Sequence, residues 1–133
     1  MPVQGGNVTR EIQSQFIGTI TGGAGSTGVF ASFASPFPDN SVLIHQVILR
    51  VQTQSTGAAT LDIGIAADAT TASDTMFDAI SVAVAGVYNP AEHGGTNGVM
   101  THVLGPTQFI NVKEDSGDVN ALVADLWIDY SVL

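Results

Sequence analysis

Residues 122–132 read LVADLWIDYSV, and apolar side chains occupy every second position of this stretch. The even positions are all apolar: Leu122, Ala124, Leu126, Ile128, Tyr130 and Val132. From residue 125 onward the odd positions are Asp125, Trp127, Asp129 and Ser131. Successive side chains of a β-strand point to opposite faces of a sheet, whereas a helix repeats every 3.6 residues. The stretch therefore predicts a strand with one buried face.

Similar alternation recurs in two earlier segments. The odd positions of residues 43–53 include Leu43, His45, Val47, Leu49 and Val51, and Leu61, Ile63 and Ile65 alternate with Thr60, Asp62 and Gly64. Weaker strand candidates are residues 15–20, 29–34, 76–84, 99–104 and 108–113. Together these segments predict about eight short strands.

Segments rich in glycine, proline and small polar residues separate the predicted strands. They are residues 21–28, 36–40, 55–58, 66–74, 88–97 and 114–118. Only residues 66–84 are rich enough in alanine to tolerate a helix, and their threonines, valines and lack of charge pairs favour loop and strand. We therefore expect an all-β fold, an antiparallel, jelly-roll-like β-sandwich. Residues 1–12 lack clean alternation and are predicted to form an extended arm before a sandwich domain of residues 13–133.

The charge balance excludes several classes of partner. Of the 133 residues, 11% are charged, against about 25% in ordinary globular chains. Twelve acidic residues face three basic ones, Arg10, Arg50 and Lys113, and the net charge is -9. Without a basic patch we expect no binding to nucleic acid or to an anionic membrane. No apolar run is long enough to span a bilayer, and the N-terminal residues do not resemble a secretory signal.

Two glycine-containing motifs match catalytic or binding signatures in residue type but lack the structural context that those signatures require. Residues 23–28 fit G-x-G-x-x-G, but Pro36 follows too soon for the helix that would hold a pyrophosphate, so a loop is the better interpretation. His93-Gly94-Gly95 is similar to an esterase oxyanion strip, yet the chain has no G-x-S-x-G nucleophile turn. Residues 88–98 are instead predicted to form a long turn.

The histidines and acids do not specify a catalytic centre. His45 and His102 are interpreted as hydrogen-bonded histidines on apolar faces, and the histidine spacing does not suit zinc. The acids gather in two regions: Asp62, Asp68, Asp74 and Asp78, and Glu114, Asp115 and Asp118. Calcium binds such oxygens, but the spacing does not match a known loop, and solvated turns are expected. We expect no metal, no cofactor and no enzymatic activity; a hydrolase using a carboxylate pair is the least favoured alternative.

Two aromatic residues are candidate contact residues. Trp127 lies on the otherwise polar face of the last predicted strand, and Phe37 lies between two prolines. Aromatic side chains are frequent anchors of protein interfaces. The alternative is that a loop or the other sheet covers these rings.

Part of the chain resembles small head-decoration proteins of tailed bacteriophages. The similar residues are STGAATLDIGIAADATTASDTMFDAISVAVAGVYN (55–89), HGGTNG (93–98) and the final ADLWIDYSVL. The match lies in the composition and order of the elements and covers about half of the chain. It contains no catalytic signature.

The resemblance implies a capsid decoration, or cement, protein. Such a protein is made in the host cytoplasm and binds the outside of the head, where it bridges subunits of the major capsid protein. The N-terminal arm would then contact the capsid through Val3, Arg10 and Glu11. A dimer or trimer of the chain is also expected, because a mean hydropathy of +0.30 with few charges predicts apolar surface for contacts.

The main alternative is a carbohydrate-binding sandwich on a phage fibre or tail tip. Its stacking platforms would be Trp127, Tyr88 or Tyr130. This alternative requires two or three aromatic rings to share one exposed face.

Overall fold

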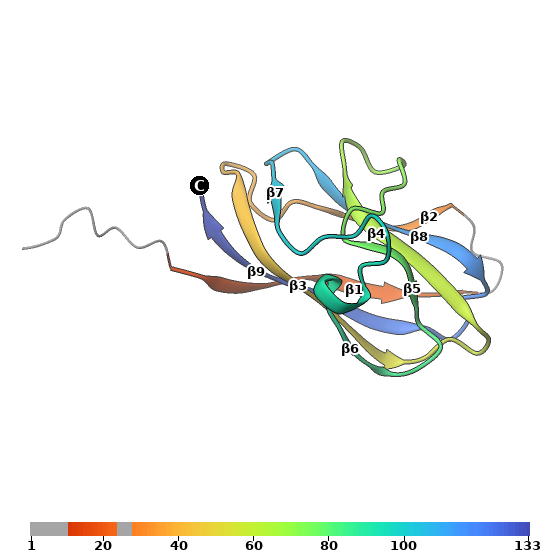
Figure 1. Ribbon diagram of the computed structural model, residues 1–133. Coiled ribbons are helices and arrows are strands. Elements are labelled where there is room, and N and C mark those ends of the chain that lie inside the picture. Colours follow the sequence, from red (N-terminus) through yellow and green to blue (C-terminus); the bar gives the residue numbers. More distant parts are fainter. Residues whose placement is uncertain (1–10, 24–27) are drawn as a thin grey trace, which may run out of the picture.

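A computed structural model describes residues 11–23 and 28–133 and shows two antiparallel β-sheets packed face to face (Figure 1). The first sheet consists of β1 (Gln13–Thr21), β9 (Val123–Val132), β3 (Val42–Thr53) and β6 (Gly86–Tyr88), in that order, with β7 (His102–Leu104) also paired to β3. The second sheet consists of β2 (Val29–Ala34), β8 (Phe109–Gly117), β4 (Ala59–Ala66) and β5 (Phe77–Ser81). The predicted all-β sandwich is confirmed.

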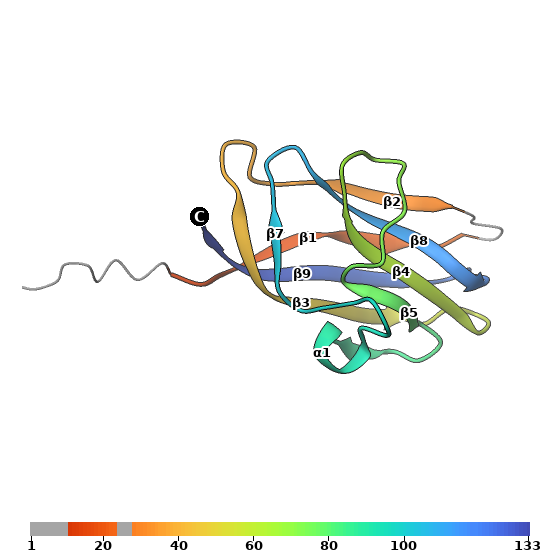
Figure 2. The same ribbon diagram turned by 45° about the horizontal axis from the view of Figure 1, so that its top comes forward.

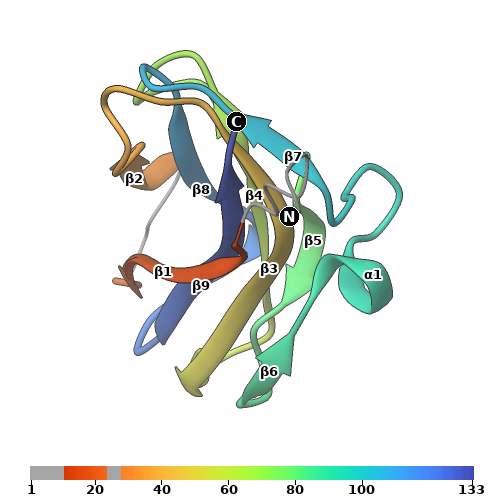
Figure 3. The same ribbon diagram turned by 90° about the vertical axis from the view of Figure 1, so that its left-hand side faces the viewer.

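The strand order is that of a jelly roll. With the short β7 set aside, the order β1-β9-β3-β6 faces the order β2-β8-β4-β5, so the chain crosses between the sheets at almost every connection. Figure 3 shows the two curved layers, with β1 and β2 together at one side and β5 and β6 at the other. The strand that the sequence does not reveal is β6, whose three residues are too few for an alternating pattern.

Strand ends differ from the predictions where pairing between strands decides them. The sequence predicts a break at residues 114–118, but β8 continues to Gly117 because Ser116 and Gly117 pair with Thr60 and Ala59 of β4. Conversely, β5 fills only the middle of residues 76–84, and β7 only the end of residues 99–104. Residues 66–84 form loop and strand, as predicted.

A β-bulge in β3 overturns the predicted alternation at its start. Ile44 pairs with Tyr130 and Gln46 with Asp129, so His45 is the extra residue of the bulge. Val42 and Ile44 are therefore the buried residues before the bulge, and Leu43 faces outward. His45 is half-buried beside the outer face, with Nε2 2.8 Å from the Ser131 hydroxyl oxygen.

The core fills the space between the two sheets. Both sheets contribute fully buried side chains: Ile20, Ile44, Leu49, Leu61, Ile63, Phe77, Ile110, Leu126 and Ile128. The even positions of β9 point into this core up to Tyr130, as the sequence predicts. Because β9 pairs with β1 on one side and β3 on the other, it lies inside the first sheet (Figure 2).

The predicted turn at residues 88–98 contains a short helix, α1 (Pro90–His93). The Asn89 side chain accepts a hydrogen bond from the Glu92 backbone N–H at 3.1 Å, and Pro90 occupies the first turn. The Gly94 N–H donates to the Pro90 carbonyl at 2.9 Å and ends the helix. Asn89 before the helix, Pro90 in its first turn and Gly94 after it are ordinary helix-end signals, so the sequence itself contains the information that predicts this helix.

Candidate functional site

The middle of the outer face of the second sheet is polar and is covered by the chain itself. Asn111 of β8, which is 1% exposed, donates hydrogen bonds to the Asp68 and Thr71 carbonyls at 2.7 and 2.8 Å. On the neighbouring strand β4, any side chain at Gly64 would collide with Ser73 and Thr75. The loop between β4 and β5 therefore lies over this face and satisfies its polar groups.

The outer face of the first sheet carries an exposed apolar row. Phe16 of β1 pairs with Trp127 of β9, and Trp127 pairs with Ile48 of β3, so the three side chains lie side by side across the sheet. The Phe16 and Trp127 rings are 5.0 Å apart between centroids, tilted by 54°. Phe16 is 40% exposed and Trp127 39% exposed. Trp127 thus lies on the outward face that the sequence predicts for it.

Two carboxylates flank the row, one on each side of Trp127 along β9. The Asp125 carboxylate accepts hydrogen bonds from the Thr19 hydroxyl, at 3.0 Å, and from the Gln52 side-chain amide. The Asp129 carboxylate accepts a hydrogen bond from the Ser14 hydroxyl at 2.6 Å. Groups of the same chain therefore hold both acids in place.

Further apolar side chains extend this outer face toward the edge of the sheet. Val87 of β6 pairs with the outward-facing Arg50 and is 66% exposed. Val103 of β7 pairs with Leu43 and is 54% exposed. The apolar members of the outer face of the first sheet are Phe16, Leu43, Ile48, Val87, Val103, Val123 and Trp127.

Of the other predicted contact residues, Glu11 and Phe37 lie apart from this row. Glu11 is exposed just before β1, and Val3 and Arg10 lie outside the described residues. Phe37, in the loop between β2 and β3, is half-buried and packs on Tyr130 with ring centroids 4.4 Å apart. Phe37 therefore closes the core at this loop.

The three aromatic residues of the carbohydrate alternative do not share a face, which corrects that expectation. Tyr130 points into the core, is 8% exposed and donates a hydrogen bond to Gln13 Oε1 at 3.0 Å. Tyr88 is half-buried and pairs with the inward-facing Leu49. Only Trp127 of the three is exposed on the outer face, where its neighbour is Phe16. The sequence does not identify Phe16 as a contact residue, because a bulge between Phe16 and Gly18 interrupts the alternation of β1.

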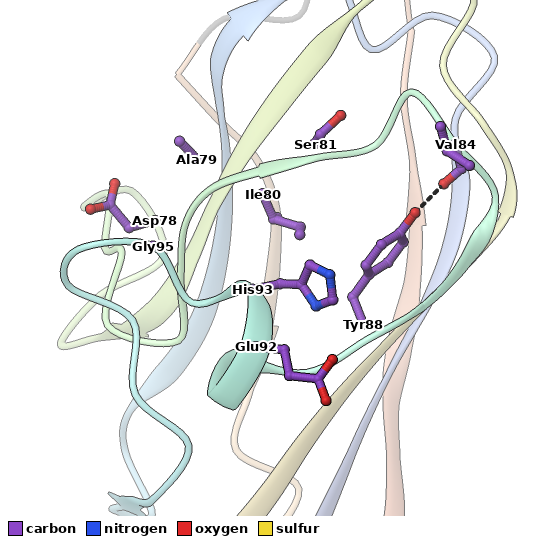
Figure 4. A pocket seen from close by; sticks show the side chains of 9 residues that line it. All are labelled: Asp78, Ala79, Ile80, Ser81, Val84, Tyr88, Glu92, His93 and Gly95. Carbon is purple, nitrogen blue, oxygen red and sulfur yellow. Dashed lines mark hydrogen bonds between the residues drawn. The ribbon is translucent and has the colours of Figure 1, made fainter.

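A pocket of about 410 Å³ lies between β5, β6 and α1 (Figure 4). Its lining includes Asp78, Ser81, Tyr88, Glu92 and His93. The Tyr88 and His93 rings meet edge to face, 4.9 Å between centroids. The Tyr88 hydroxyl points away from the imidazole and donates to the Val84 carbonyl at 2.6 Å, while Asp78 lies on the far side of His93. The ring contact is therefore one of packing, and these groups form no proton relay.

The two acidic regions predicted from the sequence meet across β4, β5 and β8. Burial raises the pKa of Asp62 above its ordinary 3.8, and a hydrogen bond from the Ala79 N–H partly lowers it again. The nearby negative charges of Asp115, Asp78 and Asp74 raise the pKa further. Within residues 11–23 and 28–133, no group of three or more His, Asp or Glu side chains is arranged to hold a metal ion.

Turn geometry accounts for several of the remaining acids. Hydrogen bonds from the Thr70 and Thr71 backbone and side chains lower the pKa of Asp68. The Asp118 carboxylate accepts from the Asn120 N–H at 2.9 Å, and Glu114 accepts from the Val119 N–H at 3.2 Å. Asp68 and Asp118 therefore lie in loops, as the sequence predicts, whereas Glu114 and Asp115 belong to strand β8, which corrects the prediction of a turn there.

We expect Asp62→Asn to raise the melting temperature at pH 7. Because the pKa of Asp62 is raised in the folded chain, folding takes up a proton above pH 3.8, and the stability falls as the pH rises through the folded pKa. Asparagine can still accept from Ala79 but carries no charge. Calorimetry at several pH values should show the gain shrinking to zero below pH 3.8.

Asp68→Asn is the matched control, because the pKa of Asp68 is shifted the other way. The stabilising effect of the wild-type Asp68 carboxylate is complete above pH 3.8 and is lost only as the pH falls through the lowered pKa of the folded chain. Asp68→Asn should therefore lower the melting temperature at pH 7. Equal effects of the two variants would contradict the assignment.

His102 is half-buried, and its Nε2 lies 2.6 Å from the Val99 carbonyl oxygen. Burial lowers the pKa of His102, opposed by this hydrogen bond. The residue is thus a hydrogen-bonded histidine, as the sequence suggests.

Among the described residues, no helix has the length and apolar character that crossing a bilayer requires. The chain matches no known protein-family model, no curated protein and no solved structure.

Proposed function

We propose that this chain is a structural virion protein that decorates the outer surface of a tailed-phage capsid. The observation that carries the proposal is an apolar row on the outer face of a jelly-roll sandwich, together with the likeness of residues 55–98 and the last strand to decoration proteins. The proposed partners are the major capsid protein and further copies of the chain. The protein would be made in the host cytoplasm and act on the assembled head.

The sandwich suits a load-bearing role. Each long strand forms a ladder of hydrogen bonds with its neighbours, and the sequence contains no cysteine, so the fold needs no oxidising compartment. When many copies bind one shell, modest contacts add up, because all of them must break before the shell opens. We therefore assign the chain a passive role in resisting the pressure of packaged DNA.

The charge of the surface fits a position outside the shell. A net charge of -9 gives the chain no attraction to the phosphate backbone of DNA and keeps it soluble. Contacts to a capsid would then depend on apolar and hydrogen-bonding groups and on basic residues of the capsid protein. We place the N-terminal arm, with Val3, Arg10 and Glu11, among these contacts.

The test is the copy number in purified particles. In virions of the phage that encodes the chain, quantitative mass spectrometry should find it in a fixed ratio to the major capsid protein, at hundreds of copies per head. Heads assembled without it should release DNA at lower temperature, and adding the purified chain should reverse this. Absence of the chain, or a few copies per particle, would contradict the proposal.

A second candidate function is glycan binding by the same row. The observation in its favour is Trp127 between Asp125 and Asp129, because an exposed ring flanked by hydrogen-bond acceptors can stack on a sugar and accept from its hydroxyls. Trp127 is the single tryptophan of the chain, so its fluorescence reports directly on this face. A saturable change on titration with glycans of the host envelope would favour this function over capsid decoration.

A further inference from the structure

We infer that the outer face of the first sheet is the contact surface between copies of this chain. The partner of this face is therefore a second, identical molecule that presents the same face. The inference does not depend on the capsid proposal, because it concerns the purified chain alone.

The two outer faces of the sandwich differ in how much apolar surface they expose. The loop between β4 and β5 covers the middle of the outer face of the second sheet, where Asn111 is hydrogen-bonded to Asp68 and Thr71. On the first sheet, Phe16 and Trp127 remain about two-fifths exposed, at 40% and 39%. An outward sheet face of a monomer is ordinarily polar. An exposed apolar face marks an interaction surface.

The outer face of the first sheet carries little of the chain's negative charge. Among the charged residues that the structure describes, Asp125, Asp129 and Arg50 lie on this face and give it a net charge of -1. The other ten acids and Lys113 give the rest of the described chain a net charge of -9. Two copies of so acidic a chain repel each other least when this face is the one in contact. A strongly basic partner would instead be drawn to the rest of the surface.

The acids of this face need no external cation. Asp125 already accepts from Thr19 and Gln52, and Asp129 accepts from Ser14. Carboxylates held in this way can be brought against an apolar surface at a smaller cost than unpartnered ones. Val87 and Val103 also extend the apolar surface beyond what one sugar ring would cover. Both observations favour a protein face over a glycan.

The size of the face is adequate for such a contact. β9 has ten residues and lies between the long strands β1 and β3, so these three strands give a footprint of about 33 Å by 14 Å, or roughly 460 Å², before β6, β7 and side-chain relief are added. Each partner of a standard interface contributes about 800 Å² of accessible surface. The row of Phe16, Trp127 and Ile48 crosses this area and provides the aromatic anchors that such interfaces use.

The first experiment measures self-association by sedimentation equilibrium of the full chain and of the double variant Phe16→Ser, Trp127→Ser. We expect the wild-type chain to associate at micromolar concentration and the double variant to associate at least about 100-fold more weakly. Val99→Ser is the matched control, because Val99 is 55% exposed but lies outside this face. A wild-type chain that stays monomeric, or a double variant that associates as tightly as wild type, would overturn the inference.

The second experiment keeps the row intact and so does not depend on the folding of the double variant. The chain has no cysteine, so a single cysteine can be placed by Gln46→Cys on this face, or by Thr60→Cys on the outer face of the second sheet as control. Maleimide labelling at Gln46→Cys should slow at least about 10-fold as the protein concentration rises through the association range, and labelling at Thr60→Cys should not. A labelling rate at Gln46→Cys that does not change with protein concentration, or that changes as much at Thr60→Cys, would overturn the inference. Tryptophan emission that responds to a glycan in a monomeric chain would assign the face to sugars instead.

Discussion

Replacing Phe77 with alanine should lower the free energy of unfolding by about 3 to 5 kcal/mol. Phe77 is completely buried, and β5 holds it against the core through its pairing with Ile63. The truncation removes most of a buried ring and leaves a cavity that two packed sheets cannot close. Because small domains are stable by only about 5 to 15 kcal/mol, the variant should melt about 10 to 20 °C lower.

Denaturant unfolding followed by far-UV circular dichroism would measure this loss. Phe16→Ala is the matched control, since it deletes the same ring from an exposed position on the outer face of the first sheet. Measured at concentrations where the chain is monomeric, the control should lose less than about 1.5 kcal/mol. Similar losses for the two variants would contradict the placement of Phe77 in the core.

Asn111→Asp should lower the free energy of unfolding by about 2 to 4 kcal/mol at pH 7. The Asn111 amide group donates to the Asp68 and Thr71 carbonyls, and its oxygen accepts from the Ser32 hydroxyl at 2.5 Å. Aspartate has nearly the same shape but replaces the donor with a negatively charged acceptor that faces two carbonyl oxygens. The variant therefore loses two buried hydrogen bonds and adds repulsion.

The pH dependence of Asn111→Asp provides an internal check. The buried carboxyl should have a pKa above its unfolded value, so the folded chain binds a proton more tightly and the loss of stability shrinks as the pH falls through that pKa. Ser32→Ala, which removes only the third hydrogen bond, should lose about 1 kcal/mol at every pH. Hydrogen exchange at the Thr70 and Thr71 amides should accelerate in Asn111→Asp alone. Unchanged exchange there would show that Asn111 does not hold the loop.

The architecture was predictable wherever one strand face is apolar over many residues. In β9 the even positions from Ala124 to Tyr130 are buried, as the pattern indicates, but at the end of the strand Ser131 is buried and Val132 is exposed, against the prediction. The pattern failed in β3, where the bulge at His45 shifts the inward side from the odd to the even positions before it. A bulge is set by the partner strand, and the sequence of β3 alone does not contain the register of its pairing with β9.

The candidate site was predictable only in part. Trp127 could be identified because it interrupts a polar face of one strand. Its neighbours Phe16 and Ile48 come from strands 111 and 79 residues away in the sequence, counted from their numbers and that of Trp127. Only the pairing of β9 with β1 and β3 brings the three together, so no pattern within one segment could reveal the row.

The order of apolar and polar residues by itself determined that this chain forms strands, which of their side chains enter a core where no bulge intervenes, and that its surface is acidic. These properties follow from local alternation and composition, which act over a few residues at a time. The tertiary structure alone decided which outer face stays apolar and which is covered by the chain's own loop. That difference depends on the register between strands far apart in the sequence, because a shift of one residue exchanges the two faces of a strand.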